Sequence, residues 1–374
     1  MAFIPRDDGS IFGRWWWTVD RWSIVALLIL IGMGIVMAFA ASPAIANRLG
    51  ADQFHLANRH LIYVAVALVA MFVCSFLTIP WIKRLSVLGM ATVLILLVAT
   101  LLLGEEYQGG KRWISFGFVD LQPSELAKPM FVICSAWLFA LDRNTRLRWP
   151  IVVQLVLLGV IASLLLAQPD VGQTAVIFAI WGAQFFLAGY SLLWVTAAGL
   201  LVVSGLAIVV WLKPHALDRV MRFWDQTAGD TYQVTQSLKA FIEGGLFGKG
   251  PGEGVIKALV PDVHADFVFA AMGEEFGMIA CVLVVAIFAL VITRGLLRLS
   301  GQSNLFIVLS GAGFLTQFGF QAIVNMSTAL NLMPTKGMTL PFISYGGSSM
   351  LGMALTMGLL LAVSRRRPKR GSLL

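Results

Sequence analysis

Four carboxylates lie close together near the end of a long polar segment, and they are well placed for acid–base chemistry. They are Asp262, Asp266, Glu274 and Glu275. Four apolar residues, 267–270, follow Asp266 directly, so we expect its carboxylate to lie at the lipid headgroups and to be partly desolvated. Desolvation makes a carboxylate a better proton acceptor. The pattern therefore favours Asp266 as a general base, and the alternative is an acidic loop in water.

The polar segment that leads to these carboxylates runs from about Lys213 to Glu275. A connection of roughly 55 residues is far longer than packed helices need, and such connections are usually functional or disordered. Aromatic residues occur along this one, which argues against disorder. Its candidate substrate-binding residues are Arg219 and Arg222, one helical turn apart, and Tyr232, Gln233 and Gln236, which would share a helical face. Glycines follow between residues 244 and 254, without the lysine and serine of a Walker motif.

Basic and acidic groups also occur together in an earlier segment. Lys111 and Arg112 precede a helix start in which Glu125 and Lys128 lie one turn apart. Ionisable groups near a membrane are costly and are usually paired or functional, and a Glu125–Lys128 ion pair at i, i+3 would satisfy both. The simpler alternative is that Ser124 and its neighbours only cap the helix.

Two more irregular segments interrupt the apolar pattern. Asp170 follows a glutamine and a proline between two apolar runs, where it is either a functional carboxylate or the N-cap of the next helix. The segment 331–349 contains two prolines and several glycines together with Lys336, Ser344 and Tyr345. Irregular backbone at membrane depth must be buried in protein or line a cavity, so this segment is a candidate anion site.

The composition places these residues in a membrane protein. The 374 residues are 59% hydrophobic and 12% charged, far from the balance of a water-soluble domain. The net charge of +8 includes a basic cluster at 365–370 that directly follows an apolar run, which indicates contact with anionic lipid rather than nucleic acid. The three cysteines lie in apolar runs, which argues against disulfides. The four histidines lack metal-ligand spacing.

Apolar runs of membrane-spanning length predict an all-α protein with ten transmembrane helices. The expected spans are 22–41, 60–80, 85–103, 125–141, 150–168, 171–189, 192–212, 269–293, 304–325 and 345–364. Basic residues concentrate in alternate short loops, which by the positive-inside rule makes segments 1–21 and 365–374 cytoplasmic. The membrane domain is then 22–364, and its large loop at 213–268 lies outside the cytoplasm, between the seventh and eighth helices. An error of one span before Lys213 would reverse that side.

Read together, these motifs closely resemble the SEDS family of cell-wall polymerases, the group that contains RodA, FtsW and SpoVE. The matching pieces are Gly110-Lys111-Arg112-Trp113, Gln122-Pro123-Ser124-Glu125 with Lys128, Gln168-Pro169-Asp170, Tyr232-Gln233 with Gln236-Ser237, and the segments 261–275 and 340–349. The likeness covers residues 22–364. It implies a ten-helix glycosyltransferase of the bacterial cytoplasmic membrane that polymerises lipid II into peptidoglycan outside the cytoplasm.

The resemblance also assigns roles. The family's essential aspartate lies in a His-Thr-Asp-Phe motif, which here reads His264-Ala265-Asp266-Phe267, so Asp266 is the expected catalytic base and Ala265 lacks the usual hydroxyl. The chemistry would be inverting, with undecaprenyl pyrophosphate as the leaving group. A divalent cation, Mg²⁺ or Mn²⁺, could assist, although the sequence contains no dedicated set of ligands.

Expected partners are a class B penicillin-binding protein, which would supply the transpeptidase domain that the chain lacks, and other proteins of a division or elongation complex. The N-terminal segment and the basic tail favour the division type, with the RodA-type elongation polymerase as the alternative. A flippase for lipid-linked precursors and a scaffold without chemistry are the rivals from other classes.

Overall fold

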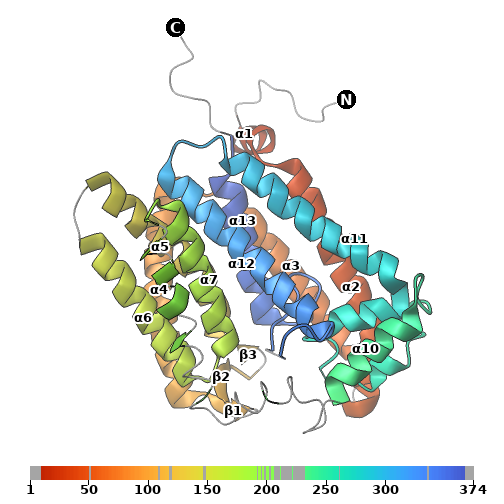
Figure 1. Ribbon diagram of the computed structural model, residues 1–374. Helices are drawn as coiled ribbons and strands as arrows, with labels where there is room; N and C mark the ends of the chain where they lie inside the picture. The colour runs from red at the N-terminus through yellow and green to blue at the C-terminus, as the bar shows by residue number, and fades with distance from the viewer. Residues whose placement is uncertain are drawn as a thin grey trace.

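The computed structural model describes residues 10–49, 52–107, 110–117, 120–145, 149–191, 232–260, 262–334 and 337–366, with scattered positions between 193 and 221. The protein is mostly helical, and its long helices run side by side in a bundle (Figure 1). Helix α1 and the C-terminal end of α13 lie at one end of the bundle. A small sheet and α10 lie at the opposite end.

Seven of the described helices are long and apolar enough to cross a membrane. They are α2 (Arg21–Leu49), α3 (His55–Ser75), α4 (Ile79–Leu103), α5 (Pro123–Thr145), α6 (Trp149–Ala167), α11 (Val268–Leu299) and α12 (Leu305–Ala329). Two shorter apolar helices accompany them, α7 (Val171–Leu187) and α13 (Gly347–Val363). Nine of the ten expected spans coincide with these helices. The other one, 192–212, falls mostly outside the described residues, so the count of ten remains a prediction.

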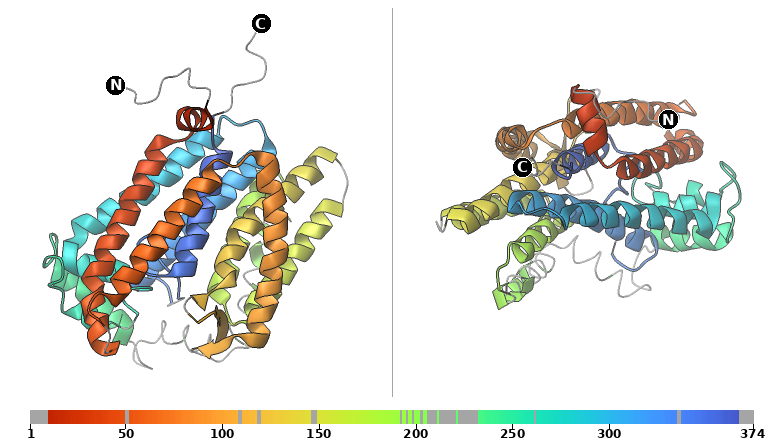
Figure 2. Two further views of the ribbon diagram at one scale, coloured as in Figure 1. Left: turned by 180° about the vertical axis from the view of Figure 1, so that it is seen from behind. Right: turned by 90° about the horizontal axis from the view of Figure 1, so that it is seen from above.

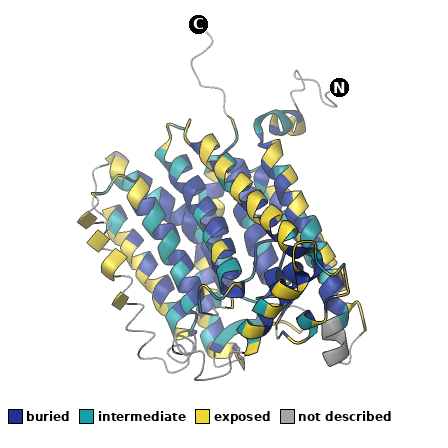
Figure 3. Cartoon of the chain, turned by 45° about the vertical axis from the view of Figure 1, so that its right-hand side comes forward, coloured by how far each residue is buried: buried dark blue, intermediate teal, exposed yellow. Residues whose placement is uncertain are grey.

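The helices are arranged around two central helices, α5 and α13. Helices α2, α3 and α4 form one side of the bundle, and α7, α11 and α12 lie on the other (Figure 2). Helix α5 packs between α4 and α12, and α13 packs between α3 and α12. Most residues of the membrane-length helices α5 and α12 are buried, whereas a third or fewer of those in α3, α4 and α6 are. Buried residues gather inside the bundle and exposed ones on its outer faces (Figure 3). Polar residues on α5 and α12 are therefore enclosed by protein rather than lipid.

The all-α expectation needs one correction, because a three-stranded antiparallel sheet stands between α4 and α5. Its strands, in the order β1-β2-β3, are β1 (Glu105–Tyr107), β2 (Gly110–Ser115) and β3 (Asp120–Leu121). Ser115 pairs with Asp120 across the turn, where Gly117 has a φ of 84°. Glycine adopts such a backbone without a steric penalty. Strands this short are held by their neighbours and carry no sequence pattern of their own.

The N-terminal segment also contains a helix that was not predicted. Helix α1 (Ile11–Thr18) begins at Ser10, whose hydroxyl accepts a hydrogen bond from the Gly13 amide at 2.9 Å. Trp15 is buried, donates from its indole nitrogen to Ser75 Oγ at 2.9 Å, and stacks on Phe76. The helix is thereby fixed against the end of α3.

The described part of the long polar segment is folded against a break in α11. Helix α10 (Tyr232–Gly244) leads into a turn and a short 3₁₀ helix, η1 (Ile256–Ala258). Gly277 interrupts α11 with a φ of 75°. The amides of Met278 and Ile279 after the break donate to the carbonyls of Gly245 and Leu246 at 2.9 and 3.3 Å. The turn after α10 therefore supplies the acceptors that the broken helix lacks.

Candidate functional site

The backbone of the Asp266 segment is held at three successive carbonyls. The Tyr345 amide donates to the His264 carbonyl at 2.8 Å, and the Ser344 hydroxyl donates to the Ala265 carbonyl at 2.5 Å. Asn325 Nδ2 donates to the carbonyl of Asp266 itself at 3.0 Å. These donors come from α12 and from the loop before α13, so elements distant in sequence fix the main chain that carries the carboxylate.

The side chain of Asp266 lies at the boundary between the protein interior and solvent. Its residue is half-buried, while Phe267 next to it is only 2% exposed. A Cβ placed on Gly337 would lie 3.7 Å from Asp266 Oδ2, so the loop before α13 faces this carboxylate. The position agrees with the partly desolvated carboxylate that the sequence predicts.

His264, Ser344 and Tyr345 lie close to Asp266 in the structure. The rings of His264 and Tyr345 lie 5.4 Å apart. Burial lowers the pKa of His264, although the nearby charge of Asp262 opposes that shift. The imidazole is therefore biased toward its neutral form. Its Nδ1 is buried without a hydrogen-bond partner among the described residues.

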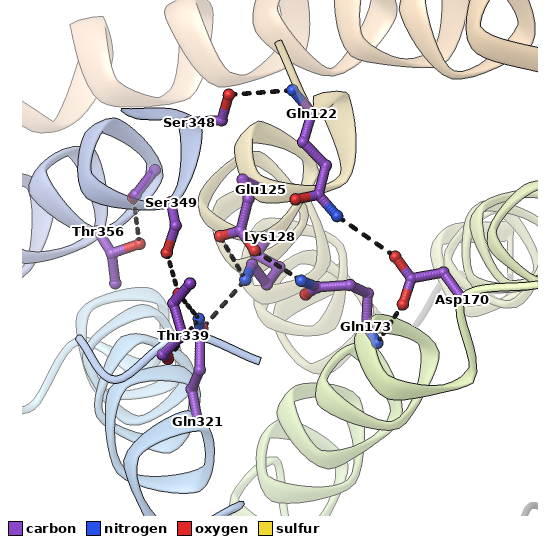
Figure 4. A network of polar contacts seen from close by, with 11 residues as sticks. Gln122, Glu125, Lys128, Asp170, Gln173, Gln321, Thr339, Ser348, Ser349 and Thr356 are labelled. Carbon is purple, nitrogen blue, oxygen red and sulfur yellow. Dashed lines mark hydrogen bonds and ion pairs between the residues drawn. The ribbon is translucent and has the colours of Figure 1, made fainter. Parts of the chain in front are cut away.

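A second group of predicted residues forms a buried polar network between α5, α7 and α12 (Figure 4). Lys128 Nζ lies 2.7 Å from Glu125 Oε2, and both side chains are almost completely buried. Gln173 Nε2 donates to Glu125 Oε1 at 2.6 Å, and Lys128 donates to Gln321 Oε1 at 3.0 Å. The expected i, i+3 ion pair is confirmed. Each buried charge therefore has an opposite charge beside it, and an unpaired buried charge would be strongly destabilising.

This network reaches the loop that holds Asp266. Gln321 Nε2 lies 3.5 Å from both oxygens of Thr339, and the Thr339 hydroxyl is hydrogen-bonded to that of Ser349. The preceding residue, Met338, accepts a 2.6 Å hydrogen bond from Asn325, whose amide also holds Asp266. A continuous set of contacts therefore runs from the buried ion pair to the backbone of the candidate base.

Asp170 and the basic residues of β2 lie beside this network. Asp170 Oδ1 accepts from the Gln173 amide at 3.1 Å, which confirms its role as the N-cap of α7. Burial raises the pKa of Asp170, and the charge of Arg112 opposes the shift. Arg112 donates to the carbonyls of Gln168 and Pro169 at 3.4 and 2.9 Å. Lys111 lies opposite Glu106 in the β1–β2 pair.

Two of the four acidic residues lie in structural contacts instead. Glu274 is fully buried, and its carboxylate accepts from the amides of residues 255, 256 and 257, each at 2.7 Å. Glu275 forms a buried ion pair with Lys257, which also donates to the Ala40 carbonyl at 3.0 Å. These contacts attach η1 to α11 and α2.

The remaining predicted residues are less closely connected to Asp266. On α10, Gln236 is buried, Gln233 is half-buried and Tyr232 is exposed. Arg219, Arg222 and Lys336 lie outside the described residues. The capping interpretation of Ser124 is wrong, because α5 already begins at Pro123 and the Ser124 hydroxyl has no hydrogen-bond partner among the described residues.

The sequence reasoning missed Gln173, Gln321, Asn325 and Thr339 as parts of the site. Gln321 and Asn325 carry a usable signal, because amide side chains four residues apart share one face of a largely apolar helix. Gln173 and Thr339 carry no comparable signal.

The described residues contain no group of three histidine, cysteine, aspartate or glutamate side chains that could hold a metal ion.

The fold and the site together define a polytopic helical membrane protein with a conformationally fixed aspartate at one end and a buried charged network beneath it. A family model described as "Cell cycle protein" matches residues 21–369. The chain thus belongs to the FtsW/RodA/SpoVE family.

Relatives of known name are similar over nearly the whole chain. A protein of Caulobacter vibrioides named "Probable peptidoglycan glycosyltransferase FtsW" is 40% identical, covering 98% of this chain and 94% of the relative. A protein of the same name from Coxiella burnetii is 36% identical, covering 93% and 96% of the two chains.

Solved structures share the fold. RodA from Thermus thermophilus superposes with a TM-score of 0.70 at 25% identity, covering 93% of this chain and 97% of that one. A chain from a structure titled "Structural coordination of polymerization and crosslinking by a peptidoglycan synthase complex" has a TM-score of 0.76 at 26% identity, covering 92% and 97%.

Proposed function

We propose that this protein is a peptidoglycan glycosyltransferase that polymerises lipid II at the outer face of the bacterial cytoplasmic membrane and serves septal wall synthesis in cell division. The observation that carries the proposal is the Asp266 carboxylate, half-buried on a backbone that three hydrogen bonds hold in place. The relatives named FtsW support the activity and the division role, since they match nearly the full length at 36–40% identity.

Lipid II carries its sugar on a pyrophosphate, which is a good leaving group, so the protein must chiefly activate the nucleophile. Asp266 takes the proton from the acceptor 4-hydroxyl as that oxygen attacks the anomeric carbon of the donor. The new carbon–oxygen bond forms as the bond to pyrophosphate breaks on the opposite face, so the configuration inverts. The leaving electron pair stays on undecaprenyl pyrophosphate.

The fixed main chain around Asp266 supports this role. A general base must lie within hydrogen-bond reach of the proton that it removes, and a misplacement of about 1 Å can cost about a hundredfold in rate. The contacts to Asn325, Ser344 and Tyr345 limit such movement. The Glu125–Lys128 network beneath them stiffens the loop that supplies two of those contacts.

Basic residues at this end of the bundle would bind the two pyrophosphates. Arginine can bind phosphate through two parallel hydrogen bonds, so Arg112, Arg219 and Arg222 are the first candidates, joined by Lys111 and Lys336. A divalent cation, if bound, would supply positive charge at the pyrophosphates, since Mg²⁺ commonly binds through substrate phosphates, water and one or two carboxylates. No step above depends on it.

We also propose the finer arrangement of the chain. Ten helices place both termini in the cytoplasm and the segment 213–268 outside it. A class B penicillin-binding protein is the expected partner, together with other proteins of the division complex. The similarity to a chain from a peptidoglycan synthase complex supports such a partner.

The test is polymerisation of lipid II by the purified chain and by two variants. Asp266→Asn removes the base but keeps the size of the side chain, so we expect glycan synthesis to fall at least a thousandfold, within the range of general-base losses. Asp262→Asn is the matched control, because Asp262 is exposed and the turn amides donate to its backbone carbonyl, which the substitution keeps. Glycan synthesis at the wild-type rate by Asp266→Asn would contradict the assignment, and a wild-type chain that moves lipid II across vesicles without making glycan would favour a flippase.

A further inference from the structure

A fully buried histidine outside the predicted site lacks hydrogen-bond partners among the described residues. His60 lies near the start of α3 and is 0% exposed. Neither its Nδ1 nor its Nε2 has a hydrogen-bond partner in the part of the chain that the structure describes. Buried polar atoms are nearly always hydrogen-bonded, so two ring nitrogens without a described partner mark His60 as a position where a ligand group could bind.

His60 borders the candidate site through Tyr345. The ring centroid of Tyr345 lies 6.0 Å from that of His60, 5.9 Å from that of Tyr63 and 5.4 Å from that of His264. The Tyr345 amide holds the His264 carbonyl, two residues before Asp266. Tyr345 therefore has an imidazole from α3 and an imidazole from the catalytic segment as neighbours.

The two imidazoles share an unusual property. The Nδ1 atom of His264 is also buried without a partner among the described residues. A neutral imidazole offers one N–H donor and one acceptor nitrogen, and a sugar hydroxyl can both donate and accept. Aromatic rings beside such groups suit the apolar face of a sugar. The chemistry of the group therefore fits a saccharide.

We propose that His60 is a substrate-binding residue whose ring nitrogens hydrogen-bond a hydroxyl or acetamido group of the lipid-linked saccharide. This inference rests on the proposed polymerase function and extends its site to α3. The saccharide supplies the partners that the protein does not.

The experiment uses the full chain and two readouts. Initial rates of polymerisation are measured against lipid II concentration, and binding of fluorescent lipid II is measured in the inactive Asp266→Asn background. His60→Phe keeps a ring but removes both nitrogens, so we expect half-saturation to move to about tenfold higher lipid II, with a smaller change in the maximal rate. His60→Gln keeps a donor and an acceptor and recovers part of the affinity.

The matched control is His55→Phe, because His55 lies on the same helix but is exposed. Unchanged half-saturation and unchanged binding in His60→Phe would overturn the inference, and so would a loss of maximal rate alone, which indicates a structural role. If His60→Phe does not fold, the smaller His60→Leu takes its place with the same expected shift. Failure of the wild-type chain and His55→Phe to make glycan would instead refute the proposed function.

Discussion

At the scale of single residues, the side chain of Asn325 connects the two segments that form the site. Its Nδ2 donates to Asp266 at 3.0 Å and to Met338 at 2.6 Å, and the residue is 1% exposed. One amide group thus connects the Asp266 segment to the loop before α13. Asn325 acts through Asp266, so it is a positioning residue.

Asn325→Leu removes both hydrogen bonds while keeping a similar volume. We expect kcat for lipid II polymerisation to fall about 10- to 100-fold, because the base is displaced, while binding of lipid II changes little. Met326→Leu is the control at the next position of α12, where a partly buried methionine packs against the hydrophobic core. Equal losses in kcat and in lipid II affinity would show that Asn325 does more than place the base.

At the scale of elements, Glu274 joins the described part of the polar segment to α11. Its carboxylate caps three successive amides at residues 255–257 while the turn after α10 completes the break at Gly277. Hydrogen bonds from amides to a carboxylate are shorter and stronger than neutral ones. The segment is therefore attached to the bundle at two neighbouring points.

Glu274→Gln should loosen this attachment. The amide cannot accept all three hydrogen bonds, so we expect a loss of about 2–3 kcal/mol in local stability, the usual cost of unsatisfied buried groups. Hydrogen exchange at residues 255–257 should accelerate while exchange in α12 stays unchanged. Glu253→Gln, on the exposed part of the same turn, should leave both rates unaltered. Uniform acceleration across the bundle would indicate global rather than local destabilisation.

At the scale of the whole molecule, Asp20 joins the N-terminal end of α2 to the C-terminal end of α11. Asp20 is buried and accepts a bidentate contact from Arg294 at 2.8 and 3.0 Å, with Arg298 at 3.3 Å. Burial alone would raise the pKa of Asp20, but hydrogen bonds from Arg294 and Ser23 and the charge of Arg298 outweigh it and lower the pKa. The ionised form is therefore the one that the fold stabilises.

Asp20→Asn should lower the free energy of unfolding by about 1–3 kcal/mol at pH 7, as expected for lost hydrogen bonds to charged groups. Because the folded pKa is below the ordinary value of 3.8, the stabilisation is present above pH 3.8 and is lost as the pH falls through the lowered pKa. Thermal unfolding should therefore separate wild type from Asp20→Asn at neutral pH and bring them together in acid. Asp52→Asn, at an exposed site, is the control. A pH-independent difference would rule out the carboxylate charge as the cause.

Much of this molecule could be predicted from local sequence. Apolar runs of about 20 residues suffice to identify membrane helices. The spacing of Glu125 and Lys128 suffices to predict their ion pair. The three-stranded sheet could not be predicted, because strands of two to six residues depend on their neighbours. The partners Gln173 and Gln321 are 48 and 193 residues away from the groups that they contact, and one sequence does not reveal such pairings.

The hydrogen bonds that hold residues 264–266 all end on main-chain carbonyls. Main-chain oxygens are common to every amino acid, so the attachment does not depend on which side chain stands between His264 and Asp266. Alanine at position 265 can therefore replace the threonine typical of the family without releasing the base. The hydrogen bond from Ser344 to the carbonyl of residue 265 is therefore available to any amino acid at that position.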